Sequence, residues 1–131
     1  MLIKDVAEKY GLSEDTLRYY ERARIIPKAP RKPSGVRDYQ SKDLEWIEHA
    51  LCMRGAGLSI KALSEYLRLF QEGDASIPAR LALLKEQMQA LDQQKARIEK
   101  TMDRLAYKIS RYEEAMKTGR LTWPEQEKSS S

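Results

Sequence analysis

Reactive side chains are scarce in this chain, which has one cysteine and one histidine among its 131 residues. A single cysteine excludes an internal disulfide framework and cannot supply the two or more thiolates that a soft metal requires. Cys52 and His49 are the one pair suited to act as nucleophile and base, yet no second histidine, Gly-rich phosphate loop or evident carboxylate pair accompanies them. We therefore expect no enzyme activity, no metal site and no cofactor.

Long apolar segments are also missing. No run of about 18 apolar residues exists, so we expect no segment to span a membrane. The N-terminal sequence MLIKDVAEKY has neither the apolar centre nor the small-residue cleavage pattern of a secretory signal. Charged residues make up 34% of the chain. A soluble protein located in the cytoplasm is the simplest interpretation.

Positive charge is concentrated in one stretch of the chain. The net charge is +4, and residues 41–131 are nearly neutral, with fifteen basic and fourteen acidic side chains. Between residues 18 and 37 the excess reaches +6, because Glu21 is the only carboxylate there. A local excess of this kind favours a surface for a polyanion. The alternatives are a solvated face and an adaptor surface for an acidic protein or a membrane. The basic side chains are Arg18, Arg22, Arg24, Lys28, Arg31, Lys32 and Arg37.

Two short helices are expected at the start of the chain. Apolar residues recur at helical spacing up to Tyr10, and Gly11 should end this first helix because glycine readily adopts positive φ. Ser13 is expected to cap a second helix, which continues to about Arg24 and which Pro27 prevents from extending further. Two short helices joined by roughly three residues are typical of a helix-turn-helix.

A wing and two more helices should complete the first domain. Residues 26–39 are expected to form a β-wing, with Ser34 and Gly35 turning between two short extended arms. Ser41 and Ser59 are expected to cap the third and fourth helices. The predicted fold class is all-α with a small β-wing: a winged helix-turn-helix DNA-binding domain over residues 1–73, followed by a long coiled-coil dimerisation helix.

The long helix is predicted over residues 74–116 from a heptad repeat. Apolar side chains alternate at spacings of four and three, which is typical of a coiled coil, and the helix would reach roughly 60 Å. The stripe is too long for the first domain to cover, so we expect a homodimer; a helix packed on its own domain is the alternative. Lys95 at a core position would fix the register. The predicted interface is Leu81, Leu84, Met88, Leu91, Lys95, Ile98, Met102, Leu105, Ile109 and Tyr112.

The remaining residues, 117–131, are predicted to be a short C-terminal tail. Trp123 is an apolar side chain in this polar segment. It either docks on the N-terminal domain of a partner or stays exposed to solvent.

The second helix and the wing carry the residues suited to bind DNA, since a helix-turn-helix places its second helix in the major groove. Thr16 and Arg18 can hydrogen-bond to bases or phosphates, and Tyr19 can clamp the backbone. Tyr20 and Tyr39 are as well suited to the core as to a DNA contact. The predicted contacts are Thr16, Arg18, Tyr19, Tyr20, Arg31, Lys32, Arg37 and Tyr39.

The run TLRYYERARII, followed by a basic loop that ends in GVRDY, resembles the MerR-type transcription regulators. The resemblance extends to about Met116. It implies a winged-helix dimer with antiparallel long helices that binds a pseudo-palindromic operator in double-stranded promoter DNA. It also implies that activation bends and untwists the spacer DNA, which acts on RNA polymerase indirectly. The contacts it implies are Arg18, Tyr19, Arg37, Tyr39 and Lys61.

Cys52 is the candidate sensor. His49, three residues earlier, and Arg54 are basic neighbours that can lower the pKa of a thiol and make it reactive. The sequence resembles the MerR subgroup that has one cysteine in this helix and responds to aldehydes and other thiol-reactive species. Oxidation, or a disulfide with another thiol, is an equal form of this signal. Alternatively, Cys52 is a small buried apolar residue and a different small ligand is sensed.

Overall fold

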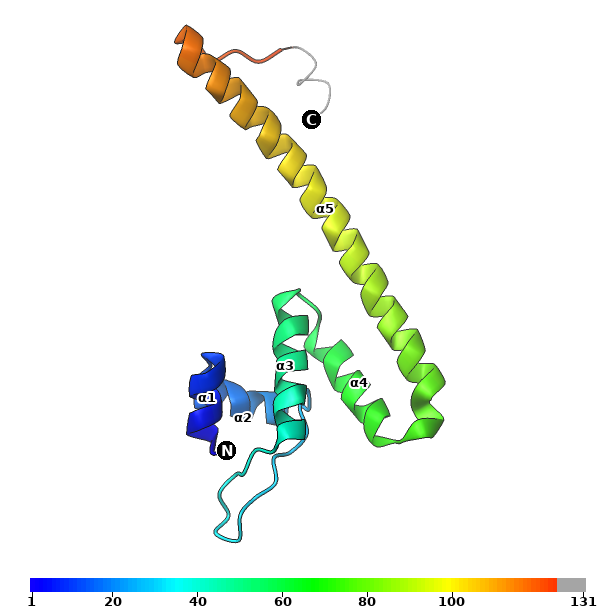
Figure 1. Cartoon of the computed structure of the whole chain (residues 1–131). Helices are drawn as coiled ribbons and strands as arrows, with labels where there is room; N and C mark the ends of the chain where they lie inside the picture. Colours follow the sequence, from blue (N-terminus) through cyan, green and yellow to red (C-terminus); the bar gives the residue numbers. More distant parts are fainter. Residues whose placement is uncertain (125–131) are drawn as a thin grey trace. The chain divides into compact units, whose positions relative to one another are not determined.

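The computed structural model describes residues 1–124 and is mostly helical (Figure 1). The chain divides into two compact units, Met1–Gln89 and the part from Ala90 onward. The last part of the predicted tail, residues 125–131, lies outside the described residues. Among those described, no helix is long and apolar enough to cross a membrane. The elements are α1 (Ile3–Tyr10), α2 (Glu14–Arg22), α3 (Ser41–Gly55), α4 (Ile60–Gln71), the 3-10 helix η1 (Asp74–Ser76) and α5 (Ile77–Thr118).

The helix-turn-helix forms at the predicted residues. α1 ends at Gly11, whose φ of 65° lies in the left-handed region that glycine tolerates. Ser13 caps α2, because its hydroxyl accepts a hydrogen bond from the backbone N–H of Thr16 at 3.0 Å. Glu14 and Asp15 lie in the first turn, where the helix dipole favours carboxylates. These local signals were sufficient to predict both helices.

The wing lacks the strands expected of it. Arg31 and Arg37 form an isolated antiparallel bridge, and no strand is present in residues 1–124, so the β-wing is not confirmed. The N–H of Lys32 donates to the carbonyl of Val36 at 2.8 Å, which closes the tip of the loop. Pro30 and Pro33 flank this bond without N–H donors, so a continuous ladder cannot form. The segment is therefore a hairpin-like loop.

The starts of α3 and α4 differ from each other in how they are capped. α4 is capped as predicted, because the Ser59 hydroxyl accepts from the N–H of Ala62 at 3.1 Å. For α3 the prediction of Ser41 as cap was wrong. Gln40 is the cap residue, and its N–H donates to Asp43 Oδ2 at 2.7 Å. An acidic side chain in the first turn thus takes the part that a serine hydroxyl plays in α4.

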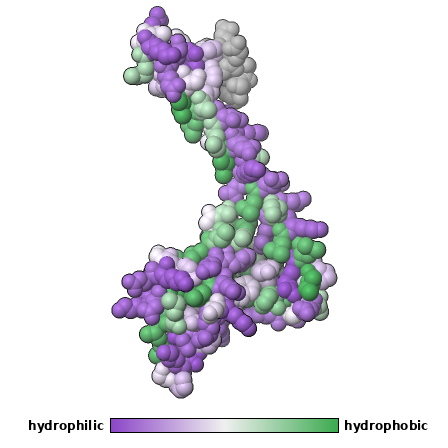
Figure 2. Space-filling model, in the orientation of Figure 1, coloured by the Kyte–Doolittle hydropathy of each residue, from purple (hydrophilic) through white to green (hydrophobic). Residues whose placement is uncertain are grey.

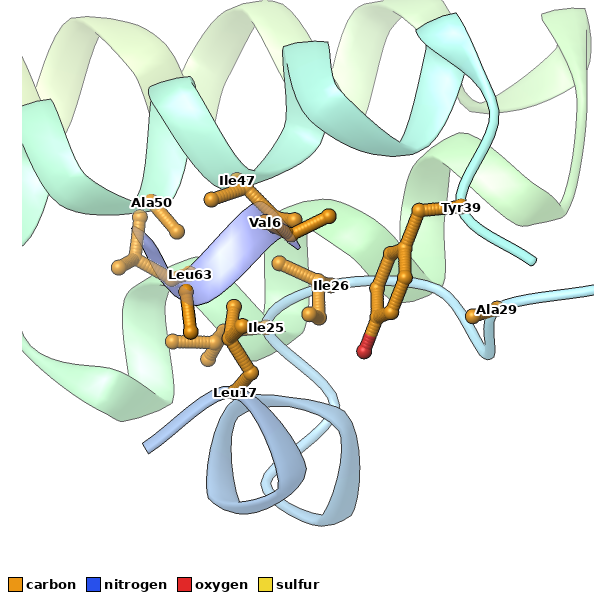
Figure 3. Close-up of a cluster of buried hydrophobic side chains, with 10 residues drawn as sticks. Val6, Leu17, Ile25, Ile26, Ala29, Tyr39, Ile47, Ala50 and Leu63 are labelled. Atoms are coloured by element: carbon orange, nitrogen blue, oxygen red, sulfur yellow. The ribbon is translucent and has the colours of Figure 1, made fainter. Parts of the chain in front are cut away.

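The core gathers side chains from α1, α2, the segment after α2, α3 and α4 (Figure 3). Leu17 from α2 and Ile25 just beyond it are almost fully buried, and they lie next to each other in the cluster (Figure 3). This core fixes the orientation of α2 with respect to the wing. Its buried members are Val6, Ala7, Leu17, Ile25, Ile26, Ala29, Tyr39, Ile47, Ala50 and Leu63.

A compact corner joins α4 to α5. The hydroxyl of Ser76, which is buried, donates to the carbonyls of Leu69 and Gly73. Arg80 Nε donates to Ser76 Oγ at 3.0 Å, and another guanidinium nitrogen reaches the Gly73 carbonyl at 3.2 Å. The same guanidinium lies 5.3 Å from the centre of the Phe70 ring, within range of a cation–π contact. One side chain thus holds the end of α4 and the first turn of α5 together.

The long helix has the predicted exposed stripe. α5 runs for 42 residues, so it spans about 63 Å. Exposure of the large apolar side chains in the heptad positions ranges from 40% at Leu84 to 86% at Met116, while Leu91 is half-buried. Figure 2 shows hydrophobic residues in green along this helix, beside hydrophilic ones in purple. A single chain leaves this stripe in contact with water.

Candidate nucleic-acid interface

The outer face of α2 presents Arg18 and Tyr19. Arg18 forms ion pairs with Asp15 at 3.0 Å and Glu14 at 3.4 Å, and its side chain stays 38% exposed. Tyr19 is 45% exposed, so its hydroxyl is free to reach a phosphate. The Thr16 hydroxyl lies 2.8 Å from the Ser13 hydroxyl and takes part in the cap. The two carboxylates hold the arginine in place while no polyanion is bound, and a surface pair of this type is weak enough to exchange for a phosphate.

Arg37 is tied to α2. Its Nε donates to Glu21 Oε2 at 3.0 Å, and both side chains are largely buried. This bond uses one edge of the guanidinium and leaves the Nη groups to contact a further anion. The wing and α2 are therefore connected by a charged contact. The sequence showed Glu21 only as the single carboxylate of a basic stretch, and its pairing with Arg37 was not predicted.

The tip of the wing carries two exposed cations, Arg31 and Lys32. Arg31 Nη1 donates to the carbonyl of Gly35 at 2.7 Å, which stabilises the turn predicted at that glycine. Gly35 has φ of 89°, a conformation that other residues avoid. Both side chains remain available to phosphates. Lys61 is likewise exposed, in the first turn of α4.

Tyr20 and Tyr39, which the sequence left equally suited to the core and to a DNA contact, differ in how deeply they are buried. Tyr20 is half-buried against the core, and its ring centre is 6.3 Å from that of Tyr19. Tyr39 is only 3% exposed, and its hydroxyl is enclosed without a hydrogen-bond partner in the described structure. Burial raises the pKa of Tyr39, helped by the nearby Glu21 carboxylate. Tyr39 is thus packed in the core of the single chain, and a contact of its hydroxyl with the DNA backbone stays a prediction.

Cys52 is exposed on α3, so the expectation of a buried apolar residue does not hold for the single chain. The predicted activation by basic neighbours has little support. Arg54 donates to the carbonyl of Leu58 at 2.6 Å, and burial lowers the pKa of His49, which favours its uncharged form. The structure thus shows that the thiol is accessible on the helix surface, and within residues 1–124 it shows no cationic partner that would activate it.

His49 belongs to an aromatic cluster that the sequence did not reveal. Its ring centre lies 5.5 Å from that of Tyr66 and 6.1 Å from that of Trp46, and Trp46 also meets Phe70 edge-on at 5.0 Å. The cluster joins α3 to α4. Spacing of aromatic residues on the two helices was the available signal, but it could not show which faces meet. In residues 1–124 no group of three or more potential ligands is placed to hold a metal ion.

Two family sequence models match the chain. One, described as MerR HTH family regulatory protein, matches residues 1–69. The other, described as MerR, DNA binding, matches residues 44–107. Together they cover the helix-turn-helix, the wing, both following helices and much of α5.

Similar proteins have regulatory names. The HTH-type transcriptional regulator AdhR of Bacillus subtilis (strain 168) is 53% identical over 91 residues, which span 70% of this chain and 65% of that protein, so the chain covers less than two thirds of its length. An uncharacterised HTH-type transcriptional regulator of Haemophilus influenzae is 33% identical over 86% of this chain and 84% of that protein.

Solved structures share the fold over nearly the whole chain. A protein classed as a MerR family transcriptional regulator from Listeria monocytogenes has a TM-score of 0.86 and 44% identity, covering 91% of this chain and 90% of its own. HiNmlR, a MerR family regulator lacking the sensor domain and bound to promoter DNA, has a TM-score of 0.82 and 31% identity, covering 92% and 95%.

Proposed function

The chain belongs to the MerR family of helix-turn-helix regulatory proteins and is a DNA-binding transcriptional regulator, and from this premise we propose that it acts as a homodimer on a pseudo-palindromic promoter operator. Each recognition helix α2 would enter the major groove of one half-site, with the wing and Lys61 on the flanking backbone. With Lys61, the proposed DNA contacts are Thr16, Arg18, Tyr19, Tyr20, Arg31, Lys32, Arg37 and Tyr39, of which Tyr39 is buried in the single chain.

The exposed heptad stripe of α5 is the observation that carries this proposal. Side chains such as Met88, Ile98 and Met102 are more than half exposed, although they are apolar and evenly spaced. A narrow stripe of this period is what a second copy of the helix covers in a coiled coil. Dimerisation would remove the stripe from water and set the distance between two recognition helices.

Activation by distortion of the spacer DNA follows from such an architecture. The dimer is one stiff object that holds the DNA at two places, so a change in the angle between its halves bends or untwists the DNA between them. Deforming a site of 20–30 base pairs costs about 1–6 kcal/mol, which phosphate contacts can offset. RNA polymerase would then respond to the altered promoter rather than to a contact with this protein.

We propose Cys52 as the point at which an aldehyde, another electrophile or an oxidant acts. Addition of Sγ to an aldehyde carbonyl carbon forms a C–S bond, and the thiol proton passes to the carbonyl oxygen to give a hemithioacetal. The exposure of Cys52 supports access by such a molecule. The alternative within the same family is a regulator of a different small ligand, in which Cys52 has no sensory role.

Two measurements test these proposals. Sedimentation of the purified protein should show a dimer, and a nuclease footprint on the DNA upstream of its own gene should cover two successive helical turns. Loss of the footprint in Arg18→Ala, with the dimer retained, would support the assignment of α2. A monomer at micromolar concentration, or no salt-sensitive affinity for the promoter, would contradict it.

The sensor is tested separately. Transcription from the same promoter is measured with and without a mild aldehyde or diamide, in wild type and Cys52→Ser. We expect the response to disappear in the variant. A Cys52→Ser protein that responds like wild type would end the thiol proposal and favour the alternative ligand.

A further inference from the structure

A second basic surface lies between the segment that follows α2 and helix α4. A cleft with a volume of about 670 Å³ opens there, within the first compact unit. Its floor includes Ile26 and Leu67, which are buried, and its rim is charged. The DNA contacts described above do not use it. The lining residues are Glu21, Arg22, Arg24, Ile26, Pro27, Lys28, Ser64, Leu67, Arg68 and Gln71.

The charge of this cleft is positive after internal pairing is taken into account. Glu21 is neutralised by Arg37. Arg68 is paired with Glu65 of α4 at 2.5 Å and with Glu72, the residue that follows this helix, at 2.6 Å. Within residues 1–124, none of Arg22, Arg24 and Lys28 forms a salt bridge. These three cations therefore give the cleft its unbalanced charge, and an anion is the ligand that would satisfy it.

The backbone at Arg24 is an independent sign that this place is used. Arg24 has φ of 60° and is the only residue other than glycine with positive φ in the described chain. It follows α2, and its N–H and that of Ile25 bond back to the carbonyls of Glu21 and Tyr20, both at 3.1 Å. Glycine is the usual residue at such a helix end because it avoids strain there. Strained positions of this type persist mainly where function requires the side chain, and here the side chain is a guanidinium at the edge of the cleft.

The cleft continues the surface that faces DNA. On α4, Ser64 and Arg68 follow Lys61 by three and seven residues, so all three lie on one face of the helix. On α2, Arg22 follows Arg18 by four residues and shares its face. A polyanion that contacts Arg18 and Lys61 would therefore meet the cleft as it passes along the protein.

From these observations we propose that Arg22, Arg24 and Lys28 bind phosphates of the DNA backbone that flanks each half-site, in addition to the predicted contacts. The proposal rests on the DNA-binding function stated above. A phosphate backbone presents negative charge at regular intervals along the whole surface, and cations that neutralise it release counterions. An acidic segment of another protein is a different ligand, and the continuity with Lys61 and Arg18 favours DNA over it.

The test uses the full-length protein and two operator duplexes, one with long flanks and one trimmed to the two half-sites. Arg22→Gln, Arg24→Gln and Lys28→Gln are compared with Lys100→Gln, which removes one exposed charge from an outward position of α5. On the long duplex each cleft variant should lower the slope of log affinity against log salt by about 0.9. On the trimmed duplex the slopes of variants and wild type should coincide, and Lys100→Gln should match wild type on both.

Arg24→Gly separates folding from binding, because glycine relaxes the turn while it removes the charge. We expect this variant to be at least as stable as wild type in urea and still to show the reduced slope on the long duplex. Unchanged slopes in all cleft variants would overturn the proposal. So would unchanged DNA affinity together with lost transcription, which would indicate an acidic protein ligand. Binding of inorganic pyrophosphate to the cleft would overturn it as well if operator DNA did not displace the pyrophosphate.

Failure of the cleft proposal can be distinguished from failure of the proposed function. If wild type does not bind the operator, or if Arg18→Ala binds as tightly as wild type, DNA recognition through α2 is wrong. If Arg18→Ala loses affinity while the cleft variants do not, only the cleft proposal fails.

Discussion

Arg37 of the wing donates from Nε to Glu21 Oε2 on the recognition helix at 3.0 Å, with both side chains largely withdrawn from water. The pair fixes the wing against α2 although the wing has no strands of its own. Removing one partner of such a pair costs more than losing an exposed ion pair, because the other charge is left without its hydrogen bond.

Glu21→Gln is therefore expected to destabilise the protein by about 1.5–3 kcal/mol, the typical contribution of a hydrogen bond to a charged group. It should also loosen the wing and weaken operator binding, even though it removes a negative charge from a DNA-binding surface. Urea unfolding and a binding titration measure the two effects. Glu45→Gln, at an exposed carboxylate of α3, is the matched control and should change neither by more than about 0.5 kcal/mol. Tighter DNA binding by Glu21→Gln would show that charge alone decides the affinity.

Arg24→Gly should raise the free energy of unfolding by about 1 kcal/mol, because a non-glycine residue in the left-handed region carries a cost of that order. The neighbouring Ala23 has φ of −75°, an ordinary helical value. Ala23→Gly should lower stability by about 0.5–1 kcal/mol, since glycine loses more backbone freedom there. Thermal unfolding of the two variants measures the difference. Equal effects of the two substitutions would mean that the turn after α2 is not held in the left-handed conformation.

Tyr10 links α1 to α3 through its hydroxyl, which donates to Glu48 Oε1 at 2.7 Å. Burial, this hydrogen bond and the charge of Glu48 raise the pKa of Tyr10 to about 12. A folded-state pKa above the unfolded value of 10 means that the contribution of Tyr10 to stability is complete below pH 10. It is lost as pH rises toward 12, because the unfolded chain releases the proton first. Tyr10→Phe should lower stability at neutral pH by about 0.5–1.5 kcal/mol and flatten this alkaline decline.

Phenolate absorbance followed against pH should show one fewer late-titrating tyrosine in Tyr10→Phe than in wild type, because burial also raises the pKa of Tyr39 in both proteins. Denaturation by urea at several alkaline pH values gives the accompanying loss of stability. If the decline is identical in both proteins, the hydrogen bond to Glu48 does not persist in solution.

Lys95 occupies a core position of the predicted coiled coil and is exposed in the single chain. Lys95→Leu should raise the thermal midpoint of the dimer, because it replaces a charge with a side chain whose burial contributes about 1.5–3 kcal/mol. Lys100→Leu, at an outward position of the same helix, should leave the midpoint nearly unchanged. Differential scanning calorimetry at two protein concentrations compares them. A lower midpoint for Lys95→Leu would mean that the heptad register is wrong.

Local signals carried most of the fold prediction. Gly11, Ser13 and Ser59 act locally. Gly11 adopts a positive φ, and each serine hydroxyl accepts from an N–H three residues later, so the neighbouring sequence was sufficient to predict them. The heptad pattern of α5 is also local in this sense. The family resemblance added the assignment to MerR regulators, which the family models match.

The sequence could not show the contacts that join distant parts of the chain. Tyr39 was left between core and surface because its environment is made by residues from α1 to α4. Arg37 was counted in the local charge excess without its pairing to Glu21, because Glu21 lies sixteen residues away. The strands of the wing were expected from its turn, but Pro30 and Pro33, which both precede that turn, lack the N–H donors that a ladder needs. Each of these depends on which groups meet after folding.

The contacts of Arg80 couple the start of α5 to the end of α4, so a change in the direction of α5 would also move α4. Its guanidinium holds the Gly73 carbonyl, the Ser76 hydroxyl and the face of Phe70, so the connection between α4 and α5 has no slack segment. A tilt of the first turns of α5 would therefore tilt α4 as well, because the two helix ends are held together. Lys61, at the opposite end of α4, would then travel furthest for a given change of angle.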